Sequence, residues 1–316
     1  MAVFTKLEKN EIEIFLKNYS VGNLLSYEGI IEGIENTNYK IITSNNSYIL
    51  TIFEKRVNPK ELPFFMNLQK NLVSHGFECP LPVENNNGSV INVIKDKFAV
   101  ITSFLKGNKL SSTLPIHCRE VGSMIAKFTN ITKSSKLKRE NTLNLKIWEN
   151  ILKKCKKTNN KSYHKYFEIL QKELFFLKRN WPTNLPKAII HADLFQDNIF
   201  FIEDKISGVI DFYFSCEDYI AYEIALAVNA WCFDLKDGFR PNNYLSLMEG
   251  FNEYSSINNE EIKSLNILLR GAAVRILVTR LHDTIYHPEN ALVVPKDPDE
   301  YLKILKWHQK NTKIDL

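Results

Sequence analysis

The stretches HADLFQDNIFF, residues 191–201, and SGVIDFYF, residues 207–214, decide how this chain folds. Each contains a short apolar run of the length of a β-strand, with acidic or amide side chains at its ends. A single Asp or Asn at a strand end most often caps a turn. The complete pattern is more specific, because H-x-D-x-x-x-x-N is followed by a strand, a turn and a second strand ending in I-D-F. It predicts a β-hairpin whose polar end residues belong to one functional site.

The chemistry of that hairpin is suggested by the polar side chains at its ends. Antiparallel pairing across a three-residue turn brings Asn198 and Asp211 into one neighbourhood. An amide oxygen and a carboxylate suit Mg²⁺, which keeps several waters and shares its ligand shell with substrate phosphates. Asp193 is then available to accept the proton of a hydroxyl nucleophile, as the catalytic-loop aspartate of protein kinases does. The sequence predicts an ATP-dependent phosphotransferase with Asp193 as the catalytic base and Asn198 and Asp211 as metal ligands.

The composition excludes other broad classes of protein. The 316 residues are 44% hydrophobic and 24% charged, which is ordinary for a globular chain. No apolar run approaches the roughly 18 residues that a membrane-spanning helix needs, so we expect no membrane association. The net charge of +5 is mild, and the lysine clusters LKKCKK and KSSKLKRE lack interleaved aromatic residues. We therefore interpret them as solvated surface and expect no nucleic-acid partner.

The cysteines and the first residues indicate a cytoplasmic protein. MAVFTKLEKNEIEIFLKNY carries early acids and no uninterrupted apolar core, so it does not resemble a signal peptide. The cysteines are odd in number, far apart and without a CxxC pair, which favours reduced thiols over a zinc site or disulfides. They are Cys79, Cys118, Cys155, Cys216 and Cys232.

The order of patterns along the chain predicts an α+β fold of two lobes. Short strand-like runs lie between residues 39 and 105, and one helical pattern, at about 60–75, interrupts them. Long helical patterns follow, with the hairpin embedded among them. We therefore predict a nucleotide-binding lobe over residues 1–105 and a helical lobe with the catalytic loop and substrate site over 106–316.

The quoted motifs resemble the aminoglycoside phosphotransferase and choline kinase superfamily, which shares the protein-kinase fold. A protein kinase proper is disfavoured, because Ala192 stands where those enzymes have Arg and I-D-F replaces D-F-G. Within the superfamily the chain is most similar to the bacterial homoserine kinases of this type. YILTIFEKRV, ELPFFMNLQKNLVSHGFECPLPV, IDFYFSCEDYIAYEIALAVNAWCF and LRGAAVRILVTRLHD carry that resemblance, which spans nearly the whole chain.

The resemblance implies a protein-kinase-like fold with a small antiparallel-sheet N-terminal lobe, an inserted helix and a larger, mainly helical C-terminal lobe. It also implies ATP and Mg²⁺ as cofactors and L-homoserine as the small-molecule substrate, phosphorylated for threonine biosynthesis. A monomer and a homodimer both remain open.

The resemblance further implies a set of nucleotide-binding residues. EGIENTNYKI, residues 32–41, matches the G-x-x-N-x-x-Y loop that closes over the phosphates, and the strand FAVITSFL leads into the segment that binds adenine. The usual phosphate-binding Lys is absent, because Thr51 stands at its position, and two nearby lysines are candidates to replace it. The implied residues are Gly33, Asn36, Thr37, Asn38, Lys40 or Lys55, Ser103 and Leu105.

Homoserine requires a partner for its carboxylate, and the planar fork of Arg suits that group. The helical segment LLRGAAVRILVTRLHD offers Arg270, Arg275 and Arg280. At 100° per residue these cannot all share one face, and we favour Arg275 or Arg280. The alternative is that such an Arg pairs structurally with a buried acid such as Asp218 or Glu223. For the substrate ammonium the candidates are Asp218, Glu217 and Tyr213.

Other functions remain open at this point. A related phosphotransferase would use an aminoglycoside, choline or another small alcohol as its acceptor, and an acidic or aromatic pocket would favour it. A non-catalytic nucleotide-binding protein is suggested by Thr51, although the intact Asp193, Asn198 and Asp211 argue against it.

Overall fold

The computed structural model describes residues 5–30, 36–54, 57–234, 236–287 and 294–312. The chain divides into two compact units. Apart from residues outside the described ranges, one unit comprises Met1–Gly107 with Ser207–Tyr213. The other comprises Asn108–Ile206, Phe214–Glu289 and Val294–Leu316. We call them the N-terminal and the C-terminal unit.

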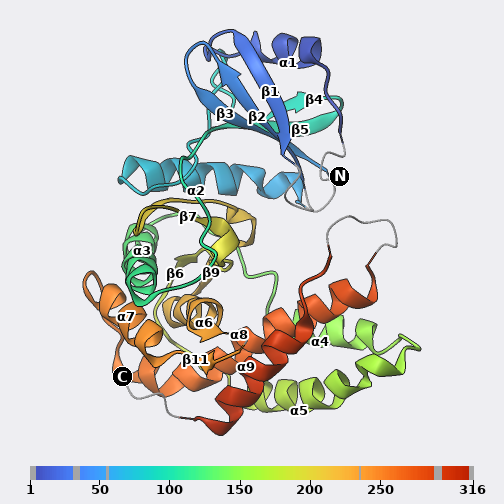
Figure 1. The fold of residues 1–316 in the computed structure, drawn as a ribbon, viewed down its shortest axis with the longest axis vertical. Helices are drawn as coiled ribbons and strands as arrows, with labels where there is room; N and C mark the ends of the chain where they lie inside the picture. Colours follow the sequence, from blue (N-terminus) through green and yellow to red (C-terminus); the bar gives the residue numbers. More distant parts are fainter. Residues whose placement is uncertain (1–4, 31–35, 55–56, 235, 288–293, 313–316) are drawn as a thin grey trace. The chain divides into compact units, whose positions relative to one another are not determined.

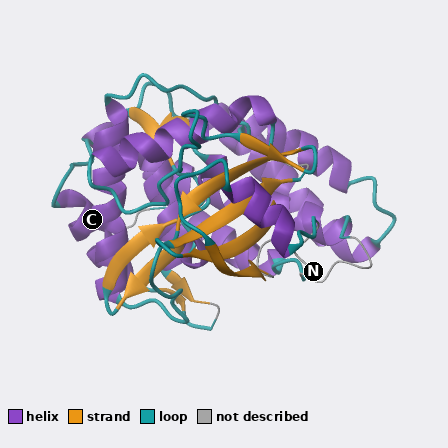
Figure 2. Cartoon of the chain, turned by 90° about the horizontal axis from the view of Figure 1, so that it is seen from above, coloured by secondary structure: helices purple, strands orange, loops and turns teal. Residues whose placement is uncertain are grey.

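The N-terminal unit is built on one antiparallel sheet, with the strand order β1-β2-β3-β5-β4 (Figures 1 and 2). Its long strands are rich in Ile, Val, Tyr and Phe, which favour a pleated and half-buried surface. The strands are β1 (Leu24–Ile30), β2 (Asn36–Thr43), β3 (Ser47–Phe53), β4 (Asn92–Ile94) and β5 (Lys97–Ser103), and the helices are α1 (Lys9–Leu16) and α2 (Leu62–Ser74).

The two faces of this sheet have separate cores because side chains alternate along each strand. Leu50 and Ile52 of β3 pack with Ile12 of α1 on one face. Phe53 of β3 packs with Phe65 of α2 in the second cluster. The sheet thus lies between α1 and α2 (Figure 1).

The segment 207–213 groups with the N-terminal unit, whereas the sequence placed all of residues 106–316 in one C-terminal lobe. The physical reason is local bonding. The N–H of Val209 donates to the carbonyl of Glu78 at 2.9 Å, and the hydroxyl of Ser207 donates to the carbonyl of Lys106 at 2.7 Å. Tyr213 packs edge-on against Phe53, with ring centroids 5.5 Å apart.

The C-terminal unit is mainly helical (Figure 1). Short strands form the pairs β6-β9, β7-β8 and β10-β11. The helices are α3 (Pro115–Lys133), α4 (Leu145–Cys155), α5 (His164–Asn180), α6 (Ile220–Trp231), α7 (Pro241–Asn252), α8 (Asn259–Ile285) and α9 (Pro298–Lys310). The strands are β6 (Lys187–Ile190), β7 (Ile199–Ile202), β8 (Lys205–Val209), β9 (Cys216–Tyr219), β10 (Phe233–Asp234) and β11 (Gly238–Phe239). β8 begins in this unit, and its residues from Ser207 onward group with the N-terminal unit.

Helices α3 and α7 of this unit pack with their backbones in close contact. A Cβ atom on Gly122 of α3 would lie 1.9 Å from the carbonyl oxygen of Leu247, and one on Gly250 of α7 would lie 2.0 Å from the carbonyl oxygen of Arg119. Both distances are far inside van der Waals contact. The two backbones touch because each helix presents a residue without a side chain.

The predicted hairpin is present, but its turn is tighter than expected. β7 and β8 are joined by two residues, Glu203 and Asp204, instead of three, since Glu203 adopts a φ of +54° that a tight hairpin turn requires. The predicted second strand also ends early, at Val209.

All five cysteines are free thiols and are buried. Within the described residues, no helix is both long and apolar enough to cross a membrane.

Candidate active site

The loop from His191 to Asn198 joins β6 to β7 in the C-terminal unit. Its second residue, Ala192, has a φ of +65°, a left-handed conformation that is uncommon for a residue with a side chain. The backbone N–H of Ala192 donates to Oε2 of Glu223 on α6 at 2.8 Å. Glu223 is fully buried, so this bond holds the strained turn in place. The residue after the turn is Asp193.

Asn198 fixes the orientation of Asp193. Its side-chain Nδ2 donates to the backbone carbonyl of Asp193 and to Oδ2 of the same residue, both at 2.9 Å. Because both bonds use the amide nitrogen, Oδ1 of Asn198 is left with no recorded bond among the described residues. An amide oriented in this way can offer its oxygen to a hard cation.

His191 supports the loop from within the core. It has no exposed surface, and its Nδ1 accepts the backbone N–H of Asp193 at 3.2 Å. Its ring also lies edge-on to Phe128. These contacts indicate that His191 stiffens the loop. Because its side chain is fully buried, it does not contact a substrate directly.

Burial raises the pKa of the Asp193 carboxyl above its usual range, while Arg275 on α8 and the bond from Asn198 act in the opposite direction. The residue as a whole is half-buried. A carboxylate with a raised pKa and a neighbouring cation is a stronger base than a solvated one and still carries charge.

Arg275 is the centre of a buried polar cluster below this loop. Only 2% of the residue is exposed, and its Nε and Nη1 atoms have no hydrogen-bond partner among the described residues. The hydroxyl of Tyr222 is buried beside the guanidinium, and Oε1 of Glu223 is buried without a hydrogen-bond partner among the described residues. Burial opposes the charge on Arg275, but Tyr222 and Asp193 outweigh it and the pKa of the guanidinium is raised. A buried donor or acceptor without a partner destabilises the folded protein, so such groups usually bind a ligand or an ordered water molecule.

Glu223 belongs to the same cluster. Burial raises the pKa of Glu223 to about 8, although the N–H of Ala192 and the charge of Arg275 lower it. The nearby Asp193 and Asp218 raise it further. Sequence reasoning considered Glu223 only as an ion-pair partner for an arginine, and its bond to Ala192 was not foreseen.

The other two arginines of α8 are already engaged. Arg270 makes two bonds to the carboxylate of Glu173, at 2.6 and 2.8 Å. Arg280 donates to Oε2 of Glu300 at 2.5 Å and to the carbonyl of Asp297 at 3.1 Å. Arg275 is therefore the one with unpartnered guanidinium nitrogens among these three.

The residues suggested for the substrate ammonium lie in different units. Asp218 is in the C-terminal unit, where it accepts Nδ2 of Asn141 at 2.6 Å, and burial raises the pKa of its carboxyl. Tyr213 is in the N-terminal unit, where it packs edge-on against Phe53 and Phe65. Aromatic packing thus accounts for the ring of Tyr213.

The predicted nucleotide-binding residues of β2 do not share one face of the sheet. Thr37 is fully buried and donates to Glu54 at 2.7 Å. Asn38, one residue on, faces the other way and accepts the hydroxyl of Thr51 at 2.8 Å. The side chain of Asn36 is buried, and its Oδ1 has no partner among the described residues. Asn36, Asn38 and Lys40 therefore lie on the same face of the sheet as Thr51, and Thr37 lies on the other.

Of the two candidate lysines, Lys40 places its ammonium 4.6 Å from the centroid of the Phe104 ring. Lys55 and Gly33 lie outside the described residues. In the adenine segment, the N–H of Ser103 donates to the carbonyl of Leu81 at 2.9 Å, and the side chain of Leu105 lies against Gly208.

The predicted metal ligands come from different units, because Asn198 lies in the C-terminal unit and Asp211 in the N-terminal unit. Asp211 has a φ of +66°, a second strained position in the polar motif. Within the described ranges, no group of three or more His, Cys, Asp or Glu side chains is arranged to hold a metal. A Mg²⁺ ion that takes most of its ligands from water and phosphate requires no such group.

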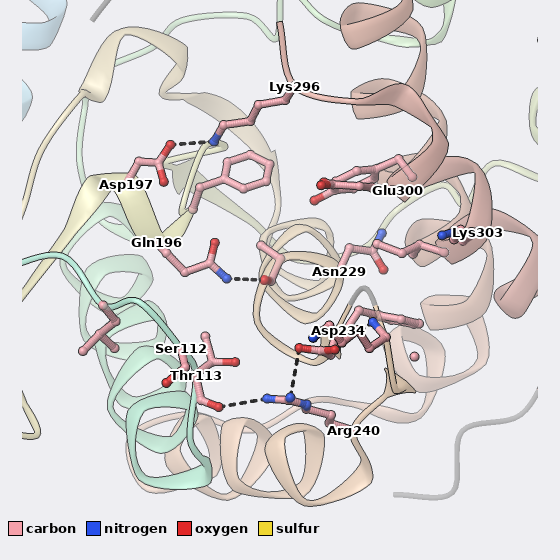
Figure 3. Close-up of a pocket in the computed structure, with 18 of the residues that line it drawn as sticks. Ser112, Thr113, Gln196, Asp197, Asn229, Asp234, Arg240, Lys296, Glu300 and Lys303 are labelled. Carbon is pink, nitrogen blue, oxygen red and sulfur yellow. Dashed lines mark hydrogen bonds and ion pairs between the residues drawn. The ribbon is translucent and has the colours of Figure 1, made fainter. Parts of the chain in front are cut away.

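A cavity of about 840 Å³ opens beside the catalytic loop, within the C-terminal unit (Figure 3). Its walls are residues 195–197 of the loop, the segment 110–113, the β10-β11 hairpin and α9. At one end the ammonium of Lys296 contacts Oδ2 of Asp197 at 2.5 Å, and at the other Arg240 contacts Asp234 at 2.9 Å. Sequence reasoning missed Lys296, because only the helix-start pattern KDPDE marks its position and nothing local links it to the catalytic loop.

Comparison with known proteins agrees with the motifs. Residues 26–244 match the family described as the phosphotransferase enzyme family. The chain is 42% identical over 309 residues to a homoserine kinase of Parvibaculum lavamentivorans, covering 98% of this chain and 96% of that protein. It is 41% identical to a homoserine kinase of Bartonella henselae, covering 98% and 95% of the two chains.

Solved structures with a similar fold are small-molecule kinases. An amicoumacin kinase in complex with AMP-PNP and Ca²⁺ superimposes with a TM-score of 0.72 at 14% identity, covering 96% of this chain and 93% of that one. A choline kinase from Cryptosporidium parvum gives a TM-score of 0.68 at 13% identity, covering 96% and 95%. These likenesses confirm the predicted kinase-like α+β fold.

Proposed function

The chain belongs to the phosphotransferase enzyme family, and on that basis we propose that it transfers the γ-phosphoryl group of ATP to the hydroxyl of L-homoserine. The products are O-phospho-L-homoserine, an intermediate of threonine biosynthesis, and ADP. The observation that carries this proposal is full-length similarity to homoserine kinases in a chain whose Asp193 and Asn198 are intact and bonded to each other.

In the proposed reaction Asp193 accepts the proton of the homoserine hydroxyl as its oxygen attacks the γ-phosphorus. The bond from that phosphorus to the bridging oxygen breaks, and ADP leaves with the electron pair. The bonds from Asn198 and the N–H of Asp193 to His191 keep the carboxylate in one orientation. Orientation of this kind supplies much of the rate in phosphoryl transfer, where the protein does little covalent chemistry.

Mg²⁺ is the cation that suits the proposed ligands. Oδ1 of Asn198 and the carboxylate of Asp211 are hard oxygen donors, and the phosphates and waters would complete the shell. The ion would neutralise charge on the β- and γ-phosphates. Calcium appears in the complex of the amicoumacin kinase, which is consistent with a divalent cation in a site of this fold.

We further propose that Arg275 holds the carboxylate of homoserine, because its buried Nε and Nη1 atoms have no partner among the described residues and can donate charged hydrogen bonds to it. Arg275→Lys keeps the charge beside Asp193 but loses the fork. We expect the KM for homoserine to rise about tenfold to a hundredfold, the size of one lost charged hydrogen bond. Steady-state kinetics with each substrate varied in turn measures this.

The matched control is Arg270→Lys on the same helix. Its guanidinium is committed to Glu173, so the change should affect stability without raising the KM for homoserine. Equal rises in the KM for homoserine and for ATP in Arg275→Lys would contradict the assignment.

The proposed acceptor is tested by measuring ADP release with homoserine, serine, choline and kanamycin. We expect kcat/KM to be highest for homoserine by at least about a hundredfold, because the alternatives lack its length or its carboxylate. A preference for choline or kanamycin would support the second candidate, a phosphotransferase of the same family with another alcohol acceptor.

A further inference from the structure

Phosphoryl transfer needs positive charge close to the three oxygens of the moving group. The catalytic loop itself supplies none, because residues 193–198 read D-L-F-Q-D-N. The position two residues after the base is the apolar Phe195. Any side-chain cation that contacts the moving group therefore comes from outside this loop.

Five basic residues line the cavity beside the loop. Arg240 is held by Asp234 and by the carbonyl of Thr113, at the end away from the loop (Figure 3). Arg280 is held by Glu300. Lys236 and Lys303 have no recorded ion pair among the described residues.

Lys296 is the basic residue of this cavity whose ammonium contacts the catalytic loop. It lies 2.5 Å from Oδ2 of Asp197 and 5.5 Å from the centroid of the Phe195 ring (Figure 3). Its charge is also one of those that lower the pKa of Asp193, which places it near the base. The ammonium of Lys296 therefore lies beside Phe195, the uncharged loop residue two positions after Asp193.

The backbone that follows Lys296 is anchored by hydrogen bonds, whereas its side chain is held by one exposed ion pair. Asp297, the next residue, caps α9 by accepting the N–H of Asp299 at 2.8 Å. The carbonyl of Asp297 accepts Nη1 of Arg280, which also bonds Glu300. Arg280 thereby fixes the segment that carries Lys296, which gives this arginine a positioning role away from the substrate.

The ion pair that holds Lys296 is easily exchanged. The side chains of Lys296 and Asp197 are 54% and 55% exposed, and an exposed pair of this kind contributes little to stability. The acceptor oxygen must approach Asp193 to about 3 Å, and the phosphorus lies about 3 Å beyond it. The flexible four-carbon stem of Lys296 lets its ammonium move away from Asp197.

We propose that Lys296 is a catalytic residue whose ammonium leaves Asp197 to contact the oxygens of the γ-phosphoryl group during its transfer. This inference rests on the proposed function. The ammonium donates hydrogen bonds and keeps all of its protons, while Asp193 takes the proton of the acceptor. Its contribution belongs to the transition state, where charge on the equatorial oxygens is greatest.

The test is Lys296→Met, which keeps the length of the side chain and removes the charge. We expect kcat to fall about a hundredfold, as for loss of one charged donor to a transition state, with both KM values within about threefold of wild type. Lys296→Arg should recover at least about a tenth of the lost rate. Lys303→Met, on the same cavity wall, is the matched control and should leave kcat within about twofold.

Four outcomes separate the possibilities. If Lys296 acted only through its pair with Asp197, then Asp197→Asn would reproduce the loss of kcat, and the inference would be wrong. A rise in the KM for homoserine at constant kcat in Lys296→Met would assign Lys296 to acceptor binding, and the inference would again be wrong. A wild-type rate in Lys296→Met would show that Lys296 has no role in catalysis, and the proposed function would still stand. Wild-type enzyme without homoserine-dependent ADP release would instead refute the proposed function.

Discussion

Asp193→Asn is expected to lower kcat by about a thousandfold or more, while ATP affinity stays within about threefold of wild type. The amide removes the group that accepts the hydroxyl proton, and general bases of this kind contribute about 10² to 10⁴ in rate. It preserves the shape of the side chain, and Nδ2 of Asn198 can still donate to the backbone carbonyl of residue 193. Single-turnover ADP release gives the rate, and calorimetric titration gives the ATP affinity.

A suitable control is Asp204→Asn in the turn of the hairpin. Asp204 is exposed and contacts His117 at 3.0 Å, outside the catalytic loop. Turnover should stay within about threefold of wild type. If Asp193→Asn turned over at the wild-type rate, the assignment of the base would be wrong.

Gly250→Val is expected to reduce the free energy of unfolding by about 3 kcal/mol or more. Its Cβ would lie 2.0 Å from the carbonyl oxygen of Arg119, so α3 and α7 must separate. In an open helix position, replacing Gly with Ala stabilises a protein by about 1 kcal/mol. We expect Gly250→Ala to destabilise instead, because even a single methyl group clashes here. Urea titration followed by circular dichroism measures the change.

The neighbouring exposed residue provides the comparison. Glu249→Ala lies on the same helix and should change stability by no more than about 0.5 kcal/mol. Unchanged stability in Gly250→Val would mean that the two helices do not approach as closely as described.

Much of the fold was predictable because its signals are local. The hairpin motif and the apolar spacing of the helices depend on residues close in sequence, and family resemblance supplied the rest. β1 was not predicted as a distinct strand, since LLSYEGI shows no clean alternation and its burial is irregular. The pairing of β6 with β9 joins four-residue strands that are distant in sequence and carry no individual pattern.

The placement of segment 207–213 was also missed, for a different reason. Its bonds to Glu78 and Lys106 use backbone atoms, which a sequence does not reveal. The bonds depend on where the chain returns after the hairpin. A domain boundary predicted from sequence divides the chain at one position, whereas a compact unit can include a segment that is distant in sequence but close in space.

The site divides in the same way. The bonded pair of Asp193 and Asn198 follows from a local motif, and their catalytic and metal-binding roles remain predictions. Three arginines on one helix could be named from sequence, but their different partners on α5 and α9 required the structure. Lys296 reaches the loop from a segment about a hundred residues further on, and no periodicity points to that contact.

The most direct test of the account is the identity of the product. The purified chain is incubated with MgATP and L-homoserine, and the phosphorylated product is followed by phosphorus NMR and mass spectrometry. The account predicts stoichiometric O-phospho-L-homoserine and ADP with wild type, and neither above background with Asp193→Asn. ATP consumption without a phosphorylated homoserine, or the same product at the same rate from Asp193→Asn, would contradict it.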